Sequence, residues 1–199
     1  MQKYGFYIDM TRCLGCRACQ LACKDKNNLP ENVLFRQVRT YETAPYPMPA
    51  VYHYSSACNH CEQPKCVRSC PTGAMHLAKD GTVQHDPAMC IKCRYCVSAC
   101  PYEVPQYVES LRKIAKCDAC INLREQGEWL ACVDACVMGC LEWGPLDVLR
   151  RIHADDVLVS EIAILPPETI TKPSILIKAK SCAMEQDFVR MQPQQLIQK

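Results

Sequence analysis

The chain has no continuous apolar run near the roughly eighteen residues that suggest a membrane-spanning helix. Its longest candidate, residues 157–165, is short and contains Glu161. The net charge is only +2, and no stripe of lysine and arginine with interleaved aromatic residues is present, which argues against a nucleic-acid partner. The sequence also lacks a phosphate-binding loop, a dinucleotide-binding fingerprint and a nucleophile-base constellation. These absences predict a chain that is not itself a catalyst.

The beginning of the chain lacks another common signal. No basic, apolar and small-residue leader precedes Cys13, so we expect no secretory signal on this chain. A length of 199 residues corresponds to one domain or to two small ones. We therefore expect a compact soluble or peripheral chain without a large substrate domain.

What the sequence does contain is cysteine, at 18 of 199 residues. Sixteen of these fall into four groups of four: Cys13, Cys16, Cys19 and Cys23; Cys58, Cys61, Cys66 and Cys70; Cys90, Cys93, Cys96 and Cys100; Cys117, Cys120, Cys132 and Cys136. The first and third groups have the spacing Cys-x2-Cys-x2-Cys-x3-Cys, which is the cluster-binding run of bacterial ferredoxins. Because a 4Fe-4S cluster takes four thiolates, sixteen cysteines supply ligands for four clusters. The pattern predicts a carrier of electrons.

Two other uses of cysteine fit less well. Disulfide scaffolds are usually much shorter, and paired bridges give no reason to repeat one strict spacing twice. Zinc suits the fourth group taken alone, because Cys117 and Cys120 form a Cys-x2-Cys knuckle of the kind found in zinc ribbons. A zinc site has no use, however, for the triple runs that begin at Cys13 and Cys90. Iron-sulfur ligation accounts for all four groups together.

The cysteine groups belong to an internal repeat. Residues 9–23 align without gaps on residues 86–100, and residues 66–74 align more loosely on residues 132–140. A short strand is expected before each triple run, at residues 4–8 and 82–85. The sequence thus predicts an α+β fold of two nested bacterial-ferredoxin-like modules, each holding two 4Fe-4S clusters, with loop insertions and an extended C-terminal tail. The expected boundaries are 1–50 for the first half of the outer module, 51–107 for the inner module, 108–153 for the second half of the outer module and 154–199 for the C-terminal extension.

The spacing also predicts how the groups share ligands. In two-cluster ferredoxins the fourth cysteine of each run binds the other cluster and is usually followed by proline. Cys70 and Cys100 are followed by proline, whereas Cys23 and Cys136 are not. The inner module therefore pairs groups two and three, and by elimination the outer module pairs groups one and four. The expected ligand sets are Cys13, Cys16, Cys19 and Cys136 (cluster 1); Cys117, Cys120, Cys132 and Cys23 (cluster 2); Cys58, Cys61, Cys66 and Cys100 (cluster 3); Cys90, Cys93, Cys96 and Cys70 (cluster 4).

Several motifs extend the pattern beyond cysteine spacing. They include Cys58-Asn-His-Cys61, Cys70-Pro-Thr-Gly-Ala-Met-His76, Cys90-Ile-Lys-Cys93-Arg-Tyr-Cys96 and Lys116-Cys-Asp118. With these motifs the chain resembles, over nearly its whole length, the four-cluster iron-sulfur electron-transfer subunits of the dimethyl sulfoxide reductase family. Some relatives have lost a cysteine of the third group and hold a 3Fe-4S cluster. Cys93 is present here, so the resemblance implies a complete 4Fe-4S cluster at that position.

The resemblance implies a function and a setting. The chain would be a non-catalytic β subunit that passes single electrons in anaerobic respiration. Its partners would be a large molybdopterin- or tungstopterin-containing catalytic subunit and a quinol-binding membrane anchor. It would lie peripherally at the cytoplasmic membrane, on the extracytoplasmic face after co-export with the catalytic subunit, or alternatively in the cytoplasm. The other functions considered are a free polyferredoxin and a β subunit for polysulfide, nitrite, formate or an aromatic substrate.

The two remaining cysteines stand apart from the quartets. Cys140 falls where the inner module has Ala74, and we expect it to pack as a small buried thiol. Ligation in place of Cys136 is the alternative. Cys182 is expected to be a bystander. His60, between two ligands, is expected to pack rather than to bind iron.

Four further features carry expectations. Basic residues near the cysteines, such as Arg17, Lys24, Lys92 and Arg94, either offset cluster charge or form a solvated face. Residues 44–49 alternate proline and predict an extended loop at a partner interface. Residues 146–153 have apolar residues at helical spacing and are expected to pack on the cluster core. Residues 166–199 are expected to extend over a partner.

Overall fold

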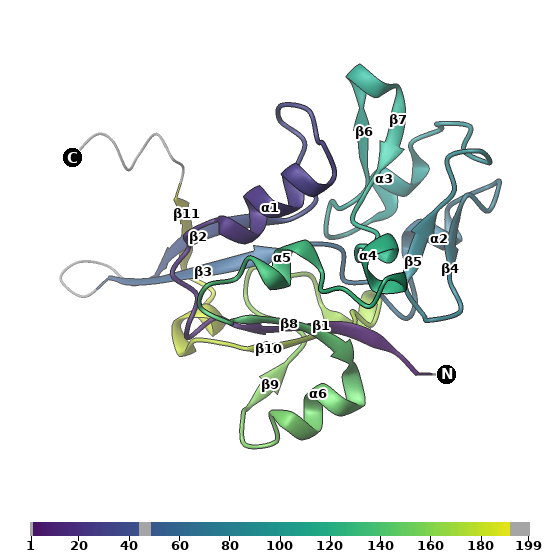
Figure 1. Ribbon diagram of the computed structural model, residues 1–199. Coiled ribbons are helices and arrows are strands. Elements are labelled where there is room, and N and C mark those ends of the chain that lie inside the picture. The colour runs from purple at the N-terminus through teal and green to yellow at the C-terminus, as the bar shows by residue number, and fades with distance from the viewer. Residues whose placement is uncertain (1, 44–48, 192–199) are drawn as a thin grey trace.

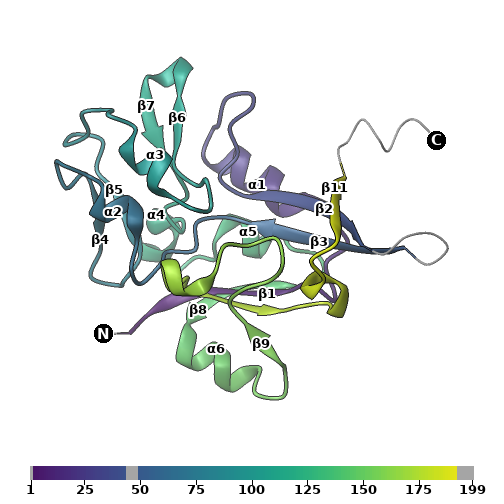
Figure 2. The same ribbon diagram turned by 180° about the vertical axis from the view of Figure 1, so that it is seen from behind.

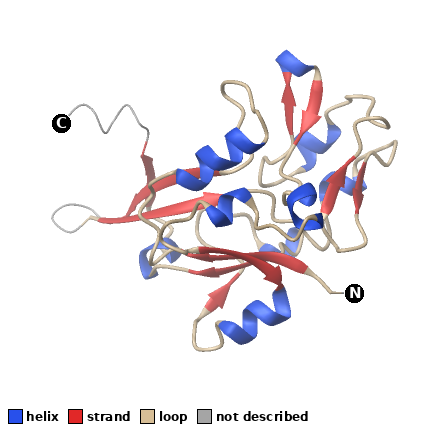
Figure 3. Ribbon diagram, viewed as in Figure 1, coloured by secondary structure: helices blue, strands red, loops and turns tan. Residues whose placement is uncertain are grey.

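The computed structural model describes residues 2–43 and 49–191. Most of the proline-rich loop expected at residues 44–49, and the last eight residues of the C-terminal extension, lie outside the described residues. Figure 3 shows that loops and turns make up much of the fold and that its helices and strands are short. No described helix is long and apolar enough to cross a membrane.

The main sheet has four strands and lies beneath the cysteine-bearing helices in Figure 1. Its strand order is β8 (Leu141–Pro145), β1 (Tyr4–Asp9), β10 (Ile175–Lys178) and β9 (Leu158–Val159). Strand β1 pairs in antiparallel fashion with β8 and in parallel with β10. Because it is covered on both faces, five of its six residues are buried. Phe6 and Ile8 face the largest apolar cluster of the chain.

A second sheet has three antiparallel strands: β11 (Phe188–Met191), β2 (Gln37–Thr43) and β3 (Ala50–Ser56). The rear view in Figure 2 shows β2 and β3 as a long ribbon beside α1 (Ala18–Lys26). Tyr41 and Tyr52 stack across the two strands with ring centroids 5.2 Å apart. Aromatic pairs of this kind stabilise a ribbon whose outer edge is otherwise exposed.

A separate lobe holds most of the inner module, on the right of Figure 1. It contains two hairpins and two helices: β4 (Met75–Leu77) with β5 (Val83–His85), β6 (Gln106–Val108) with β7 (Lys113–Ala115), α2 (Lys65–Arg68) and α3 (Tyr95–Ala99). A 3-10 turn, η1 (Glu109–Leu111), joins the strands of the second hairpin. The main apolar cluster of this lobe has only five buried residues, two of them cysteines. Such a small core needs a metal or another cross-link to be stable.

The remaining helical segments are equally short. They are α4 (Ile121–Glu125), α5 (Ala131–Asp134), α6 (Leu146–Ile152), η2 (Glu168–Ile170) and η3 (Ser181–Met184). Even α1, with nine residues, is shorter than the 12–15 residues below which an isolated helix is marginal in water. Tertiary contacts must therefore hold these helices in place.

The internal repeat read from the sequence reappears in the strand pairing. In the outer module β1 precedes the first triple run and pairs antiparallel with β8, which follows Cys136. In the inner module β5 precedes the second triple run and pairs antiparallel with β4, which follows Cys70. Helix α1 packs on α5 just as α3 packs on α2. The strands expected at residues 4–8 and 82–85 are both present, with small shifts at their ends.

Two expectations about the C-terminal half differ from the structure. Helix α6 forms where it was predicted, but it packs on the far face of the main sheet, where Leu149 contacts Tyr7 and Leu176 instead of the cysteines. The reason is that β1 is buried on both faces and requires a cover on the side away from the cysteines. The C-terminal extension is extended, but through residue 191 it pairs with the rest of the protein, because β10 and β11 complete the two sheets.

Candidate functional site

Three cavities are each lined by one complete cysteine quartet. We name the quartets as sites 1 to 4, in the order of the predicted clusters. Site 1 is lined by Cys13, Cys16, Cys19 and Cys136, with Cys140 beside them. Site 3 is lined by Cys58, Cys61, Cys66 and Cys100, and site 4 by Cys70, Cys90, Cys93 and Cys96. In each cavity three cysteines come from one group and the fourth from its partner group, as the crossed pairing predicts.

Site 2 lies where α1 packs against α5. Its four thiols, Cys23, Cys117, Cys120 and Cys132, are all buried. Burial, together with the nearby charge of Cys132, raises the pKa of Cys23 to about 12. Burial and the charges of Cys58 and Cys23 likewise raise the pKa of Cys117 well above its usual value. These thiols become thiolates only when a strong cation such as iron takes the place of the proton.

The four sites form a series through the molecule. Burial raises the pKa of Cys19 in site 1, and the charge of Cys132 in site 2 adds to that shift. Sites 2 and 3 meet where Cys117 and Cys58 pack in one apolar cluster. Sites 3 and 4 meet around buried side chains of the inner lobe. Cys16 at one end of the series and Cys93 at the other are exposed, whereas the thiols of site 2 are buried.

The backbone of the cysteine loops is bent in a distinctive way. Six non-glycine residues with positive φ lie in these loops: Arg17, His60, Lys92, Arg94, Ala119 and Cys120. Such conformations cost about 1–3 kcal/mol each and gather at functional sites. Arg17 precedes α1 and Arg94 precedes α3 with nearly the same φ, 64° and 65°. The same sharp turn therefore presents the third cysteine of each triple run.

A buried cation close to Cys19 of site 1 and Cys23 of site 2 is Arg36, which lies outside every cysteine motif. Its side chain is 1% exposed, and its guanidinium carbon lies 4.4 Å from the ring centre of Phe6. Its Nη1 donates hydrogen bonds of 3.1 Å to the carbonyl and the hydroxyl of Ser55, but among the described residues its Nε and Nη2 have no partner. Burial lowers the pKa of Arg36, yet the charges of surrounding cysteines outweigh burial and raise it overall.

A second buried cation serves sites 2 and 3. Lys116 lies directly before Cys117 and lines the cavity of site 3. Its ammonium donates a 2.6 Å hydrogen bond to the carbonyl of Cys117 and another to the carbonyl of Val83. Buried cations are costly unless an anion accompanies them. Arg36 and Lys116 thus create a positive environment at the centre of the series.

The basic residues singled out from the sequence lie elsewhere. Arg17, Lys92 and Arg94 are exposed, and Arg94 pairs with Glu109 at 3.3 Å. Lys24 donates a 2.7 Å hydrogen bond to the carbonyl of Pro30. Of the two readings left open by the sequence, exposure favours the solvated face for Arg17, Lys92 and Arg94, and the buried cations beside the sites are Arg36 and Lys116. Sequence proximity to a cysteine could have found Lys116 but not Arg36, which directly precedes β2 and lies outside the motifs.

His60 packs between sites 2 and 3. Its Nδ1 accepts a 3.1 Å hydrogen bond from the backbone N–H of Val83, so the ring proton is assigned to Nε2. Nε2 lies 4.0 Å from the sulfur of Cys117. The expectation that His60 packs is met, and the ring also directs an N–H toward a site 2 thiol. Its position between Cys58 and Cys61 was the only sequence signal for that role.

The two remaining cysteines are both buried. Cys182 lies in η3 and packs in the large apolar cluster, and it lines none of the three cysteine cavities. Cys140 is 4% exposed and lines site 1, with its sulfur 3.3 Å from that of Cys136. A hydrogen bond from Cys140 is the main cause of a lowered pKa of about 6 at Cys13. Cys140 is thus buried as expected, but it packs among ligand candidates and not simply among apolar side chains.

The donor sets fit a cubane better than a single ion. Among residues 2–43 and 49–191, no three cysteine, histidine or carboxylate side chains converge on one point as the ligands of one metal ion would. A 4Fe-4S cluster has four iron atoms, each bound by its own thiolate, so its ligands surround a cavity. Arg36 is a buried cation with two donors unpaired among the described residues, and a thiolate-ligated cluster supplies negative charge that suits it. The described residues therefore fit 4Fe-4S clusters.

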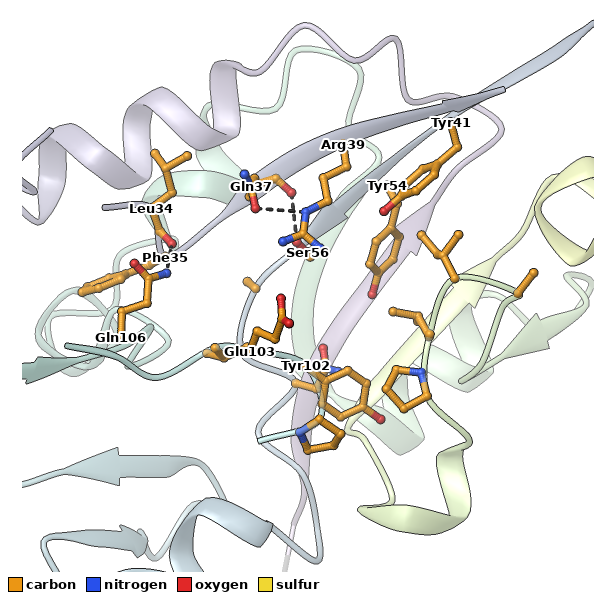
Figure 4. Close-up of a pocket in the computed structure, with 18 of the residues that line it drawn as sticks. Leu34, Phe35, Gln37, Arg39, Tyr41, Tyr54, Ser56, Tyr102, Glu103 and Gln106 are labelled. Carbon is orange, nitrogen blue, oxygen red and sulfur yellow. Dashed lines mark hydrogen bonds between the residues drawn. The ribbon is translucent and has the colours of Figure 1, made fainter. Parts of the chain in front are cut away.

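A cavity of about 470 Å³ among the described residues is lined by no cysteine. Figure 4 shows Gln37, Arg39 and Ser56 on one wall, with Tyr102 and Glu103 opposite. In the lining of this cavity, Arg39 Nε donates a 3.0 Å hydrogen bond to Gln37 Oε1. The cavity marks the seam where the loop after Cys100 meets the second sheet. Without thiols it is not a cluster site.

Comparison with known proteins agrees with this chemistry. Residues 49–146 match the family model of the 4Fe-4S dicluster domain. The protein is 42% identical over 184 residues to the B subunit of the anaerobic dimethyl sulfoxide reductase of Escherichia coli, covering 88% of each protein. It is 41% identical to the corresponding subunit of Haemophilus influenzae, covering 92% of each. It is 35% identical to the B subunit of the polysulfide reductase of Wolinella succinogenes, over 88% of this protein and 94% of that one.

Proposed function

Because this protein belongs to the family of iron-sulfur electron-transfer subunits that includes the B subunits of dimethyl sulfoxide reductase, we propose that it relays single electrons through four 4Fe-4S clusters. It is an electron-transfer subunit and not the catalytic subunit of its complex. The observation that carries the proposal is the series of four cysteine quartets, with exposed thiols at both ends and buried thiols between them. We assign one cluster to each of sites 1 to 4.

Clusters supply one-electron redox chemistry, and their potentials respond to charge, hydrogen bonds and solvent exposure. The residues of this protein control those three factors. Arg36 and Lys116 place positive charge beside the buried sites, which favours the more negative, reduced state. His60 directs an N–H toward Cys117, with the same effect. The apolar cluster around Cys117 and Cys58 excludes water between sites 2 and 3.

Each end of the series carries exposed apolar side chains that suit a protein partner. Beside site 1, Leu14 is 66% exposed and Val137 is 80% exposed. Beside site 4, Ile91 and Tyr95 are each 63% exposed. Apolar residues around an exposed ligand loop let a partner exclude water where an electron crosses. Electrons thus enter at one end and leave at the other.

Membership of the family supports two proposed partners. One is a large molybdopterin- or tungstopterin-containing catalytic subunit, and the other is a quinol-binding membrane anchor. The protein lies peripherally at the cytoplasmic membrane, on the extracytoplasmic face after co-export with the catalytic subunit. Relatives are named for dimethyl sulfoxide, polysulfide and thiosulfate reductases, so electron-transfer subunits of this type serve several substrates. The catalytic partner selects the substrate.

A free polyferredoxin is the second candidate. A C-terminal tail that extends over a fixed partner would have argued against a free polyferredoxin. Strands β10 and β11 instead pair within the protein, so the tail does not distinguish the two candidates. Family membership favours a fixed subunit. Co-purification tests this directly: a large pterin-containing subunit should accompany the protein through gentle detergent extraction, and isolation as a lone soluble protein supports the free carrier. Protease treatment of spheroplasts should degrade the subunit, whereas protection places it in the cytoplasm.

The cluster count is tested on anaerobically purified protein by measuring iron, acid-labile sulfide and zinc per protein molecule. Four cubanes require about sixteen iron and sixteen sulfide, together with several interacting EPR signals during reductive titration. A Cys182→Ala variant is the matched control, because this buried thiol lies outside all four sites and its loss should leave the iron content unchanged. About eight iron with bound zinc would contradict the four-cluster assignment and restrict redox activity to the inner module.

A further inference from the structure

The outer module contains one more thiol than its two clusters require. Cys140 lines site 1 beside the four assigned cysteines and is almost fully buried. Among the described residues, sites 3 and 4 are each lined by four cysteines. The fifth thiol of site 1 has no part in the four-cluster relay as assigned above.

The loop that carries Cys140 has a counterpart in the inner module. Gly139 and Gly73 both have positive φ, 55° and 71°, at the same place in the two loops. The carbonyl of Cys140 accepts a 2.9 Å hydrogen bond from the N–H of Asp9, and the carbonyl of Ala74 accepts a 2.7 Å bond from the N–H of Asp86. Asp9 and Asp86 align in the internal repeat. Cys140 therefore occupies the position of Ala74, whose methyl group faces site 4.

The position places a sulfur within reach of a ligand corner. The sulfur of Cys140 lies 3.3 Å from that of Cys136, and the backbone N–H of Cys140 donates to the Cys136 sulfur at 3.4 Å. Metal–thiolate bonds, as in zinc sites, are about 2.3 Å long. Two sulfurs 3.3 Å apart can therefore reach the same iron atom. Cys136 is the more exposed of the two.

We propose that Cys140 is a second competent ligand for the iron corner that Cys136 holds, so that site 1 has five thiols for four corners. The inference rests on the proposed function, because it concerns a cluster assigned there. In the exchange, the iron–sulfur bond to Cys136 breaks and a bond to Cys140 forms. Cys140 releases its thiol proton and Cys136 takes one up, and no electron is gained or lost. Site 1 thereby keeps its cluster when Cys136 is oxidised or replaced.

The test compares alanine variants of the full-length protein, purified anaerobically, by iron and sulfide content and by EPR. Cys136→Ala should keep the iron content of the wild type and show no oxidised-state signal of a three-iron cluster, with an altered site 1 signal in the reduced protein. Cys140→Ala should keep the iron content of the wild type, because Cys136 still holds the corner. The double variant should lose the site 1 cubane, which lowers iron by about one to four atoms, depending on whether a three-iron cluster remains. An oxidised-state EPR signal identifies that three-iron product.

The matched control is Cys70→Ala in site 4, where Ala74 supplies no spare thiol. This variant should lose its cubane as the double variant of site 1 does. The proposal is overturned if Cys136→Ala alone loses as much iron as the double variant, or if Cys140→Ala is the damaging single change. A wild-type protein with far fewer than sixteen iron atoms would instead refute the four-cluster assignment, and this inference with it.

Discussion

Replacing His60 by asparagine should lower the reduction potential of the site 2 cluster by at most about 65 mV. The Nε2–H of His60 points at the Cys117 sulfur from 4.0 Å, and it stabilises the more negative, reduced state. A net hydrogen bond is worth about 0.5–1.5 kcal/mol. Since a tenfold change, about 1.4 kcal/mol, corresponds to about 59 mV for one electron, its loss shifts the potential by about 20–65 mV. The upper end of this range applies only if the full free energy of the hydrogen bond stabilises the reduced state and none of it stabilises the oxidised state.

Asparagine is chosen because it preserves the remainder of the site. Its side-chain oxygen can take the place of Nδ1 and accept the hydrogen bond from Val83. It also tolerates the positive φ of 42° that residue 60 adopts. Glutamine is the matched control, because its longer side chain carries an N–H to the position of Nε2. The potentials are measured by EPR-monitored redox titration of iron-replete protein.

The result that refutes this reasoning is specific. An unchanged site 2 potential in His60→Asn would show that the 4.0 Å contact carries no electrostatic weight. An equal decrease in His60→Gln would attribute the effect to altered packing against Trp143 and not to the lost N–H. A loss of iron at site 3 would indicate that His60 chiefly holds the loop between Cys58 and Cys61.

Three other variants test the remaining physical claims. Gly15→Ala should destabilise the fold by at least about 1–2 kcal/mol and should lose iron from site 1 before the other sites. The reason is that Gly15 has φ +69° and that a Cβ there would lie 2.6 Å from the His53 ring. Unchanged thermal unfolding and unchanged iron content would contradict this. Arg36→Met should lower the reduction potentials of the clusters in sites 1 and 2, because it removes a buried positive charge close to both. Redox titration measures these potentials, and unchanged values would mean that the Arg36 side chain only fills space. Burial lowers the pKa of His53 in the folded state. Below about pH 6.5, the ordinary pKa of histidine, the unfolded state therefore binds more protons than the folded state. The protein loses stability as the pH falls through that value. In His53→Gln the denaturant midpoint should therefore change less with pH between about pH 7.5 and 5.5 than it does in the wild type. An equal dependence of the midpoint on pH in the two proteins would contradict the role given to His53.

The cysteine sites were accessible from sequence because cluster ligation imposes strict local spacing. Three thiolates bind one cluster from adjacent turns of a single loop, so each triple run predicted its own site. The crossed fourth ligand was inferred from the proline after Cys70 and Cys100. The structure places the four cysteines of sites 1, 3 and 4 around three cavities and buries those of site 2 together. Whether each set binds a cluster remains a prediction.

Long-range packing was much less accessible. Residues 146–153 have a helical pattern, but nothing in that pattern states which face of β1 the helix covers. Strand β10 reads as a generic apolar stretch, yet it pairs with β1 and becomes part of the main sheet. Arg36 carries no motif at all. Its burial results from β2 lying across the quartets, a contact between segments that are distant in sequence.

The sequence by itself determined the chemistry of this protein, because the number and spacing of thiols select iron-sulfur clusters and the repeat selects two nested modules. The tertiary structure alone decided the environment of each site. It set the order of the sites, the burial of site 2, the cations Arg36 and Lys116 beside them, and the contact between Cys140 and Cys136. The physical reason is the distance along the sequence over which each feature is set. The spacing of cluster ligands is set within one loop, whereas the burial and charge of a site depend on which distant segments the fold brings together.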